Sequence, residues 1–189
     1  MRVIAGRAGG VRLVVPKNRV RPTMDRVKAA IFSSLGDAVI GARILDLFAG
    51  SGGLGIEALS RGAASVLFVD ENRQSVATIE KNLLKTHSQA RVRKQEVFDF
   101  LRRWSSTEKF RIIFADPPYE KMKSGIGYTE KLLTSEALAE ILEPDGFFIL
   151  EKLPAEKIPE SKLWNVVRAK TYGATNVLFL QRTPDSGLM

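Results

Sequence analysis

The sequence predicts a doubly wound α/β fold, with a mostly parallel sheet that ends in an antiparallel hairpin. From residue 42 onward, short and continuously apolar runs alternate with longer amphipathic stretches. Strands that are apolar throughout are typical of a parallel sheet covered by helices on both faces. Near the C-terminus the pattern changes, because the β-like runs 163–171 and 175–181 leave no room for a helix between them. These two runs predict the hairpin.

Seven strands are expected, at residues 44–48, 66–69, 91–95, 110–115, 147–150, 163–171 and 175–181. Amphipathic stretches at 72–86 and 128–142 predict helices between them. Ahead of the sheet, Arg2–Ala5 and Val11–Val15 predict a small basic β-hairpin, and Thr23 is positioned to cap a helix that runs to Leu35. The expected parts are an N-terminal hairpin and helix over 1–40, the α/β domain over 41–183 and a loose tail over 184–189.

The composition excludes several classes of site. The 189 residues include no Cys and a single His, so disulfides, thiolate metal sites, a cysteine nucleophile and a histidine-rich metal centre are all excluded, and no metal is expected. No run approaches the ~18 apolar residues of a membrane span. We therefore expect a cytoplasmic protein without membrane contact, and a monomer.

The net charge of +8 is concentrated near the N-terminus, where residues 1–28 hold eight Lys and Arg against one acidic residue, Asp25. A nearly neutral body with a basic arm predicts contact with a polyanion, most simply nucleic acid, although a solvated and solubilising surface is the alternative. The arginines assigned to this contact are Arg2, Arg7, Arg12, Arg19, Arg21 and Arg26.

A glycine-rich turn follows the first strand of the sheet. Gly50, Gly52 and Gly55 match the pattern G-x-G-x-x-G, and Asp70 ends the next strand, about 20 residues beyond the first glycine. In a doubly wound sheet this combination predicts a nucleotide-like ligand, with backbone close to the ligand and the acid on its ribose hydroxyls.

Asp46, in the first strand, helps to choose between two cofactors. A carboxylate is a poor neighbour for the pyrophosphate of NAD and a good partner for the ammonium group of S-adenosylmethionine. Strand 91–95 then delivers Glu96 to the adenine amine, with Asp99 left to cap the following helix. We therefore expect S-adenosylmethionine, with S-adenosylhomocysteine as the product. The residues assigned to it are Asp46, Phe48, Gly50, Ser51, Gly52, Asp70, Asn72, Glu96 and Val97.

The fourth strand runs directly into Asp116, Pro117, Pro118 and Tyr119, which we predict to be the catalytic turn. Two prolines fix the backbone and remove two N–H donors, so this turn presents acceptors. The Asp116 carboxylate and the Pro117 carbonyl suit the two hydrogens of an exocyclic amine, while Tyr119 suits the face of its heterocycle. Such a turn would aim the amine nitrogen at an electrophilic methyl group.

The Asp-Pro-Pro-Tyr turn resembles the signature of amino-group methyltransferases with the Rossmann-like, S-adenosylmethionine-dependent fold. Further matches at Met1–Gly6, Arg21–Thr23, Leu45–Gly55 and Glu57–Ala63 closely resemble the RsmD family, over about residues 1–182. That family comprises bacterial enzymes that methylate a guanine N2 of 16S ribosomal RNA. The resemblance implies this reaction, with naked rRNA or an assembling small subunit as the partner, and a guanine held by Asp116, Pro117 and Tyr119. It also implies that Val97 lies beside Glu96 at the adenine, and that Arg21 and Thr23 contact the RNA.

Other functions stay open on the sequence. An adenine-N6 methyltransferase of DNA or RNA shares the proline turn, and protein glutamine methylation uses a related turn that begins with Asn, where this chain has Asp116. The glycine spacing also permits a nicotinamide-dependent oxidoreductase, and a noncatalytic RNA-binding module could keep the same fold.

Overall fold

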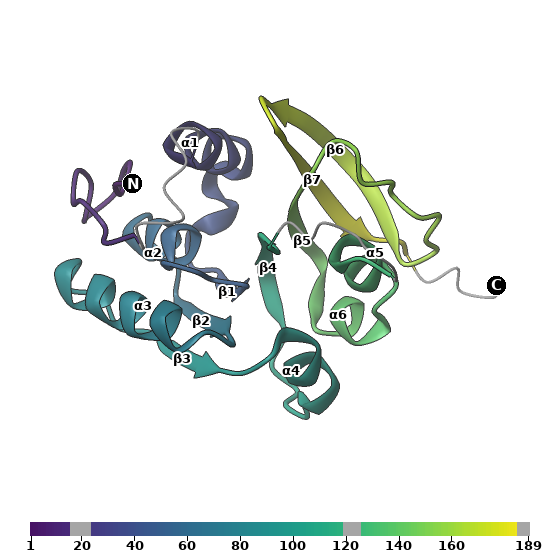
Figure 1. Cartoon of the computed structure of the whole chain (residues 1–189), viewed down its shortest axis with the longest axis horizontal. Coiled ribbons are helices and arrows are strands. Elements are labelled where there is room, and N and C mark those ends of the chain that lie inside the picture. The colour runs from purple at the N-terminus through teal and green to yellow at the C-terminus, as the bar shows by residue number, and fades with distance from the viewer. Residues whose placement is uncertain (16–23, 119–125, 185–189) are drawn as a thin grey trace.

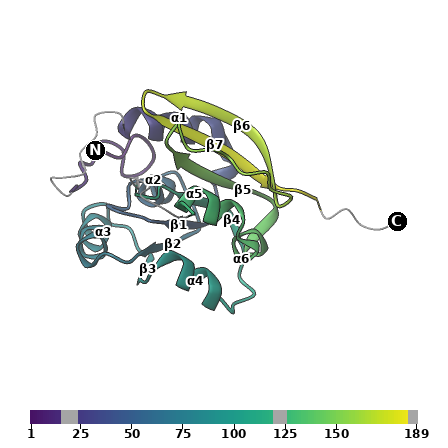
Figure 2. The same ribbon diagram turned by 45° about the vertical axis from the view of Figure 1, so that its right-hand side comes forward.

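A computed structural model describes residues 1–15, 24–118 and 126–184, and a single seven-stranded sheet lies at its centre (Figure 1). The strands are β1 (Arg43–Leu47), β2 (Ser65–Asp70), β3 (Arg91–Lys94), β4 (Phe110–Ala115), β5 (Leu142–Lys152), β6 (Trp164–Tyr172) and β7 (Thr175–Arg182). Their order across the sheet is β3-β2-β1-β4-β5-β7-β6. Strands β1 to β5 pair in parallel, whereas β7 is antiparallel to both β5 and β6. Figure 2 shows this hairpin extending the sheet beyond β5, which confirms the predicted fold class.

Helices cover both faces of the sheet. They are α1 (Met24–Leu35), the 3-10 helix η2 (Gly36–Val39), α2 (Gly53–Ser60), α3 (Arg73–Lys85), α4 (Val97–Arg103), α5 (Tyr128–Leu133) and α6 (Glu136–Glu140). Figure 1 shows α1, α2 and α3 on one side and α4, α5 and α6 on the other. No helix in the described ranges is long and apolar enough to cross a membrane.

The apolar strands are explained by burial on both faces. Consecutive residues of a strand point to opposite sides of the sheet. In β1, Ile44 packs in the cluster that contains the α1–α3 side chains, and its neighbour Leu45 packs in the cluster that contains the α4–α6 side chains. Both side chains are fully buried. Since neither face is left to solvent, these strands have no polar alternation.

The single helix predicted over 128–142 is wrong, because the chain forms two short helices there. Thr134 ends α5, and its hydroxyl donates to the Glu130 carbonyl at 2.9 Å. Ser135 then accepts a hydrogen bond from the Leu138 N–H at 3.2 Å and so caps α6. Hydroxyl side chains favour helix ends over helix interiors, and this competition divides the stretch.

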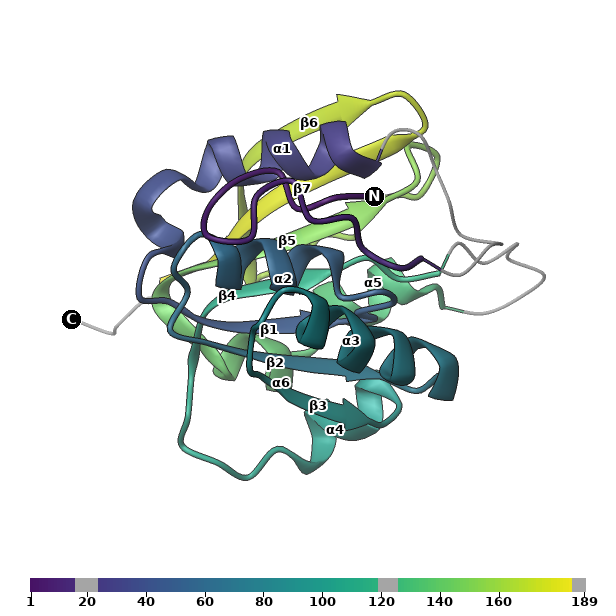
Figure 3. The ribbon, with the colours of Figure 1, turned by 90° about the vertical axis from the view of Figure 1, so that its left-hand side faces the viewer.

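The predicted N-terminal hairpin is also not formed as two strands. Within residues 1–15 there is one antiparallel bridge, between Arg2 and Arg12. The ladder goes no further because the Val11 N–H donates to the Ala8 carbonyl at 3.1 Å, within the turn. The N–H groups of Ile4 and Ala5 donate to the Glu57 carboxylate of α2, at 2.7 and 3.1 Å. Figure 3 shows the purple N-terminal segment running beside α1 and α2.

Candidate active site

A cavity of about 350 Å³ lies at the carboxyl ends of the parallel strands. This is the edge at which open α/β sheets bind their ligands, and the volume suits a small molecule. We call its acidic side the sheet wall, formed by Asp46, Asp70, Glu71, Glu96, Asp116 and Glu151. We call another part of its lining the N-terminal wall, formed by Met1, Val15, Val27 and Lys28.

Most residues assigned to the cofactor from the sequence lie on this cavity, namely Asp46, Phe48, Gly50, Ser51, Asp70, Asn72, Glu96 and Val97. Gly52 is the exception. It precedes α2 with φ of +78°, and a Cβ atom there would lie 3.2 Å from Ile56 and 3.3 Å from Ile79. Gly52 therefore makes the left-handed turn and packs on the core, and its assignment to the cofactor stays a prediction.

Asp46 is the most perturbed carboxyl group of the site. Its side chain is buried and accepts a hydrogen bond from the Gly55 N–H at 2.9 Å. Burial raises the pKa of Asp46 to about 8, and the carboxylates of Asp116 and Asp70 act in the same direction. The Gly55 hydrogen bond opposes this shift. With this pKa Asp46 is mostly protonated at neutral pH, and a cation bound beside it would favour its ionised form.

Asp70 connects the glycine turn to the start of α3. Its two carboxylate oxygens accept from the N–H groups of Gly50 and Asn72, each at 2.8 Å. The Asn72 side chain caps α3 by accepting from the Gln74 N–H at 2.8 Å. A carboxylate can accept about four hydrogen bonds, so Asp70 keeps capacity for ribose hydroxyls while it holds the turn.

The sequence-based division of roles between Glu96 and Asp99 is wrong in one respect. Glu96, not Asp99, caps α4, because its carboxylate accepts from the Asp99 N–H at 2.8 Å. The Asp99 side chain pairs with Arg102 and does not line the cavity. Glu96 lines it, so the acid chosen for the adenine lies on the cavity wall and caps the helix as well.

The proline turn lies at the same edge. In the sheet, Ala115 of β4 is in register with Leu47 of β1 and Leu150 of β5, and this pairing brings Asp116, Pro117 and Pro118 to the cavity. Tyr119 lies outside the described residues, as do Arg19, Arg21 and Thr23. No group of three or more His, Asp or Glu side chains in the described part of the chain is arranged to hold a metal ion.

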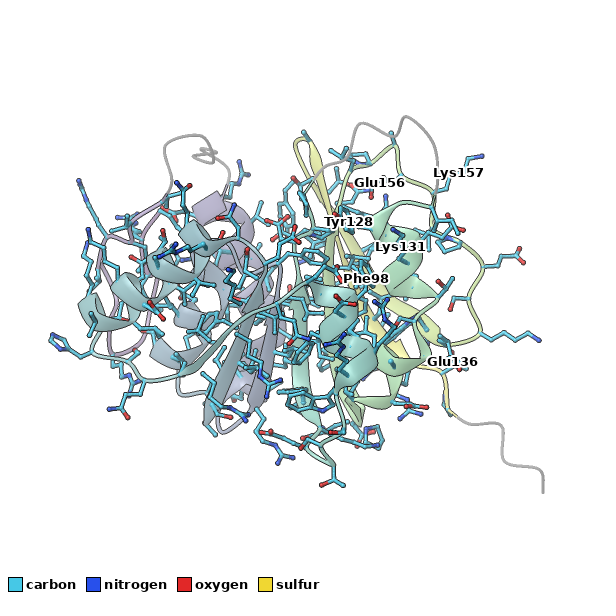
Figure 4. The ribbon with its side chains drawn as sticks, turned by 60° about the horizontal axis from the view of Figure 1, so that its bottom comes forward. Phe98, Tyr128, Lys131, Glu136, Glu156 and Lys157 are labelled. Carbon is cyan, nitrogen blue, oxygen red and sulfur yellow. The ribbon has the colours of Figure 1, made fainter. Side chains whose placement is uncertain are left out.

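Sequence reasoning missed an aromatic cluster beside this turn. Tyr128 lines the cavity, with its ring centroid 5.3 Å from that of Phe48 and 6.0 Å from that of Phe98, whose ring is almost parallel to it. The Lys131 ammonium lies 5.7 and 5.8 Å from the Phe98 and Tyr128 centroids (Figure 4). Phe48 has φ of +54°, which is rare for a bulky residue and typical of functional sites. No spacing in the sequence signals Tyr128, because it opens a short helix after the turn.

Sequence reasoning also missed the N-terminal wall. Glu57 of α2 is fully buried and binds the Arg61 guanidinium at 2.8 Å and the Lys28 ammonium at 3.2 Å, besides the two backbone N–H groups described above. Asn82 of α3 exchanges hydrogen bonds with the Val14 backbone at 2.7 and 2.9 Å and also donates to the Ser51 carbonyl at 2.9 Å. The N-terminal segment therefore packs on the domain and completes the cavity. The predicted RNA residues Arg2, Arg7, Arg12 and Arg26 are solvent-exposed.

Residues 1–181 match the family model described as Conserved hypothetical protein 95, which is the RsmD family. The chain belongs to the RsmD family. Membership confirms the family expected from the sequence, and with it the methyltransferase class.

Two relatives of this RsmD-family chain align over nearly its whole length. YlbH of Bacillus subtilis, named provisionally as an rRNA methyltransferase, is 40% identical over 187 residues, covering 96% of this chain and 99% of the relative. The ribosomal RNA small subunit methyltransferase D of Haemophilus influenzae is 32% identical over 185 residues, covering 96% and 93%.

Solved structures agree on the fold. A hypothetical protein of Thermus thermophilus superposes with a TM-score of 0.79 at 29% identity, covering 96% of this chain and 99% of that one. A 16S rRNA N2 guanine methyltransferase of Thermus thermophilus, RsmC, in complex with AdoMet and guanosine, shares the fold with a TM-score of 0.69 at 23% identity. That comparison covers 88% of this chain and 44% of RsmC.

Proposed function

We propose that this protein transfers a methyl group from S-adenosylmethionine to the exocyclic N2 amine of a guanine in the 16S rRNA of the small ribosomal subunit. One observation carries the proposal: the acceptor-only turn of Asp116 and Pro117 lies on the same cavity as the glycine turn and its acids. The small-subunit rRNA named for the Haemophilus influenzae relative supports the substrate class.

The residues present fit this cofactor. The sheet wall is acidic, which suits a ligand with sulfonium and ammonium groups and disfavours the pyrophosphate of a dinucleotide. Asp46 would hold the ammonium, Asp70 the ribose and Glu96 the adenine amine. When bound, S-adenosylmethionine supplies a methyl carbon made electrophilic by the adjacent sulfonium.

Asp116 and Pro117 would orient the nucleophile. Both accept hydrogen bonds, so together they can hold the two hydrogens of the guanine N2 amine and turn its lone pair toward the methyl carbon. Transfer of the methyl group from sulfur to nitrogen would place positive charge on that nitrogen. The Asp116 carboxylate faces that charge and stabilises it. The departing N2 proton passes to Asp116 or to water.

The RNA must present its guanine unpaired, because a base inside a duplex cannot enter a cavity of this kind. The exposed side chains of Arg2, Arg7, Arg12 and Arg26 would then contact phosphates around the target. Naked rRNA and an assembling small subunit are both compatible with this proposal.

The test is Asp116→Ala assayed with labelled S-adenosylmethionine and small subunits from cells that lack the enzyme. We expect methyl transfer to fall about 10²- to 10³-fold, while the affinity for S-adenosylhomocysteine, whose sulfur is neutral, stays close to wild type. Asp145→Ala, at an exposed residue of β5, is the matched control and should keep full activity. Near-wild-type methyl transfer by Asp116→Ala would contradict the role assigned to the Asp116 carboxylate.

The product identifies the reaction. Nuclease digestion and mass spectrometry of the labelled RNA should place the methyl group on guanine N2. A methyl group on adenine N6 would support the adenine methyltransferase alternative, and tight binding of NADH without S-adenosylhomocysteine binding would support the oxidoreductase.

A further inference from the structure

The cavity wall is unbalanced in charge. Among the described residues that line it, six side chains are acidic and one, Lys28, is basic. The amino-acid end of S-adenosylmethionine carries an ammonium and a carboxylate. A wall of carboxylates can hold the ammonium, but the carboxylate needs a cation. Lys28 is the basic side chain on this wall that could supply one.

Lys28 is held in an unusual setting for a lysine. It belongs to α1, and only 3% of the residue is exposed. Its ammonium donates to the Arg2 carbonyl at 2.5 Å and lies 3.2 Å from the Glu57 carboxylate. An ammonium has three N–H donors, so two contacts leave one donor for a ligand. Burial lowers the pKa of Lys28, and the Glu57 carboxylate opposes that shift.

Lys28 also lies at the correct end of the cavity. Its ammonium donates a hydrogen bond to the Arg2 carbonyl. The residue before Arg2, Met1, packs against the glycine turn, where a Cβ atom on Gly53 would lie 2.5 Å from the Met1 sulfur. The same turn is tied to Asp46 through the Gly55 N–H. The N-terminal wall therefore meets the carboxyl assigned to the cofactor's ammonium.

We propose that Lys28 binds the carboxylate of the amino-acid end of S-adenosylmethionine, and that Glu57 positions its ammonium for this contact. The inference rests on the proposed function, because it adds a residue to the same cofactor site. Lys28 would then be a binding residue of the methyl-transfer reaction, and Glu57 a positioning residue that acts through it.

The first test varies the protein and compares two ligands by calorimetry. Lys28→Met should bind S-adenosylhomocysteine about 10- to 100-fold more weakly. The affinity for 5′-methylthioadenosine, which has the same nucleoside but no amino-acid end, should stay within about twofold of wild type. Lys28→Arg should recover most of the loss. Equal losses for both ligands would mean that Lys28 only supports the fold, and would overturn the proposal.

Lys152→Met is the matched control. Lys152 is also buried, with 2% exposure, its ammonium donates to a backbone carbonyl, Leu153, at 2.6 Å, and burial lowers its pKa. It does not line the cavity. We expect this variant to bind both ligands as the wild type does, whatever its loss of stability.

The second test needs no variant and so does not depend on the folding of Lys28→Met. S-adenosyl-3-thiopropylamine differs from S-adenosylhomocysteine only by lacking the carboxylate, and it should bind the wild-type protein about 10-fold more weakly or worse. Equal affinities would overturn the proposal, and so would a Lys28→Met variant that loses rRNA binding alone. If the wild-type protein binds none of the three ligands, the proposed function itself fails, and the inference falls with it.

Discussion

The two walls of the cavity are built by different means. The sheet wall is set by backbone pairing, because β1, β2 and β4 end side by side and place Asp46, Asp70 and Asp116 at one edge. The N-terminal wall is set by side chains, since Glu57 and Asn82 capture backbone groups of a segment that forms a single bridge of its own within residues 1–15. The sheet wall therefore depends on strand pairing, whereas the N-terminal wall depends on a few buried polar side chains.

The largest effect is expected from Glu57→Gln, which tests the N-terminal wall. The change leaves the Lys28 ammonium buried without its counter-charge, and breaking a buried ion pair in this way costs about 3–5 kcal/mol. Urea unfolding should show this loss. Glu108→Gln is the control, because Glu108 pairs with Arg91 at the surface and such pairs contribute about 0–1 kcal/mol. Similar small losses in both variants would contradict the role given to Glu57.

Asp46→Asn tests the sheet wall through the pH dependence of cofactor binding. Because burial raises the pKa of Asp46 to about 8, a bound cation must displace its proton at lower pH. The affinity for S-adenosylmethionine should therefore rise with pH between about 6 and 7.5, by up to about 10-fold per pH unit, and calorimetry in two buffers should detect the released proton. The Asn variant should bind weakly and show little of this dependence. An unchanged pH profile in the Asn variant would exclude Asp46 as the source.

The raised pKa of Asp46 also predicts how the stability of the fold changes with pH. Its folded pKa of about 8 lies above the ordinary value of 3.8, so the folded state holds more protons and loses stability as pH rises from about 4 to 8. Thermal melts of Asp46→Asn should lack this part of the decline.

The smallest effect is expected at the arginines of the N-terminal segment. Arg7 and Arg12 are exposed. Replacing both with Ala should weaken RNA binding by about 10-fold and reduce the salt dependence by about one unit of slope each, because the proposed function gives each side chain a phosphate contact. Affinity for S-adenosylhomocysteine should not change, since the packing of the segment uses Glu57, Ser60 and Asn82. Equal losses of RNA and cofactor binding would show that these side chains support the cavity only. Arg103 and Lys157, exposed elsewhere, provide the matched double variant.

Much of the sheet wall could be predicted from the sequence. Continuous apolar runs located five of the seven strands, β1, β2, β4, β5 and β7. The residues at or near the ends of the parallel strands include acids of the cavity. These features are local, because a strand buried on both faces must be apolar along its length and parallel strands must end at one edge. The proline turn is equally local, since two adjacent prolines fix their own backbone.

The errors and omissions concern competition between neighbours or contacts between distant residues. Whether a hydroxyl caps a new helix at Ser135, and whether Glu96 or Asp99 caps α4, depends on alternatives of similar energy within a few residues. The cavity roles of Met1 and Lys28 were missed because they depend on distant partners.

The amino-acid order by itself therefore determined the sheet and its acid-bearing edge. Only the tertiary structure decided how the N-terminal segment closes the cavity, because Glu57 and Ile4 are 53 positions apart, and Asn82 and Val14 are 68 apart. A buried carboxylate or amide has no periodic signal. Its partners are the backbone groups that the folded chain brings next to it. Burying those groups without a hydrogen bond would cost free energy, so they bind the side chain.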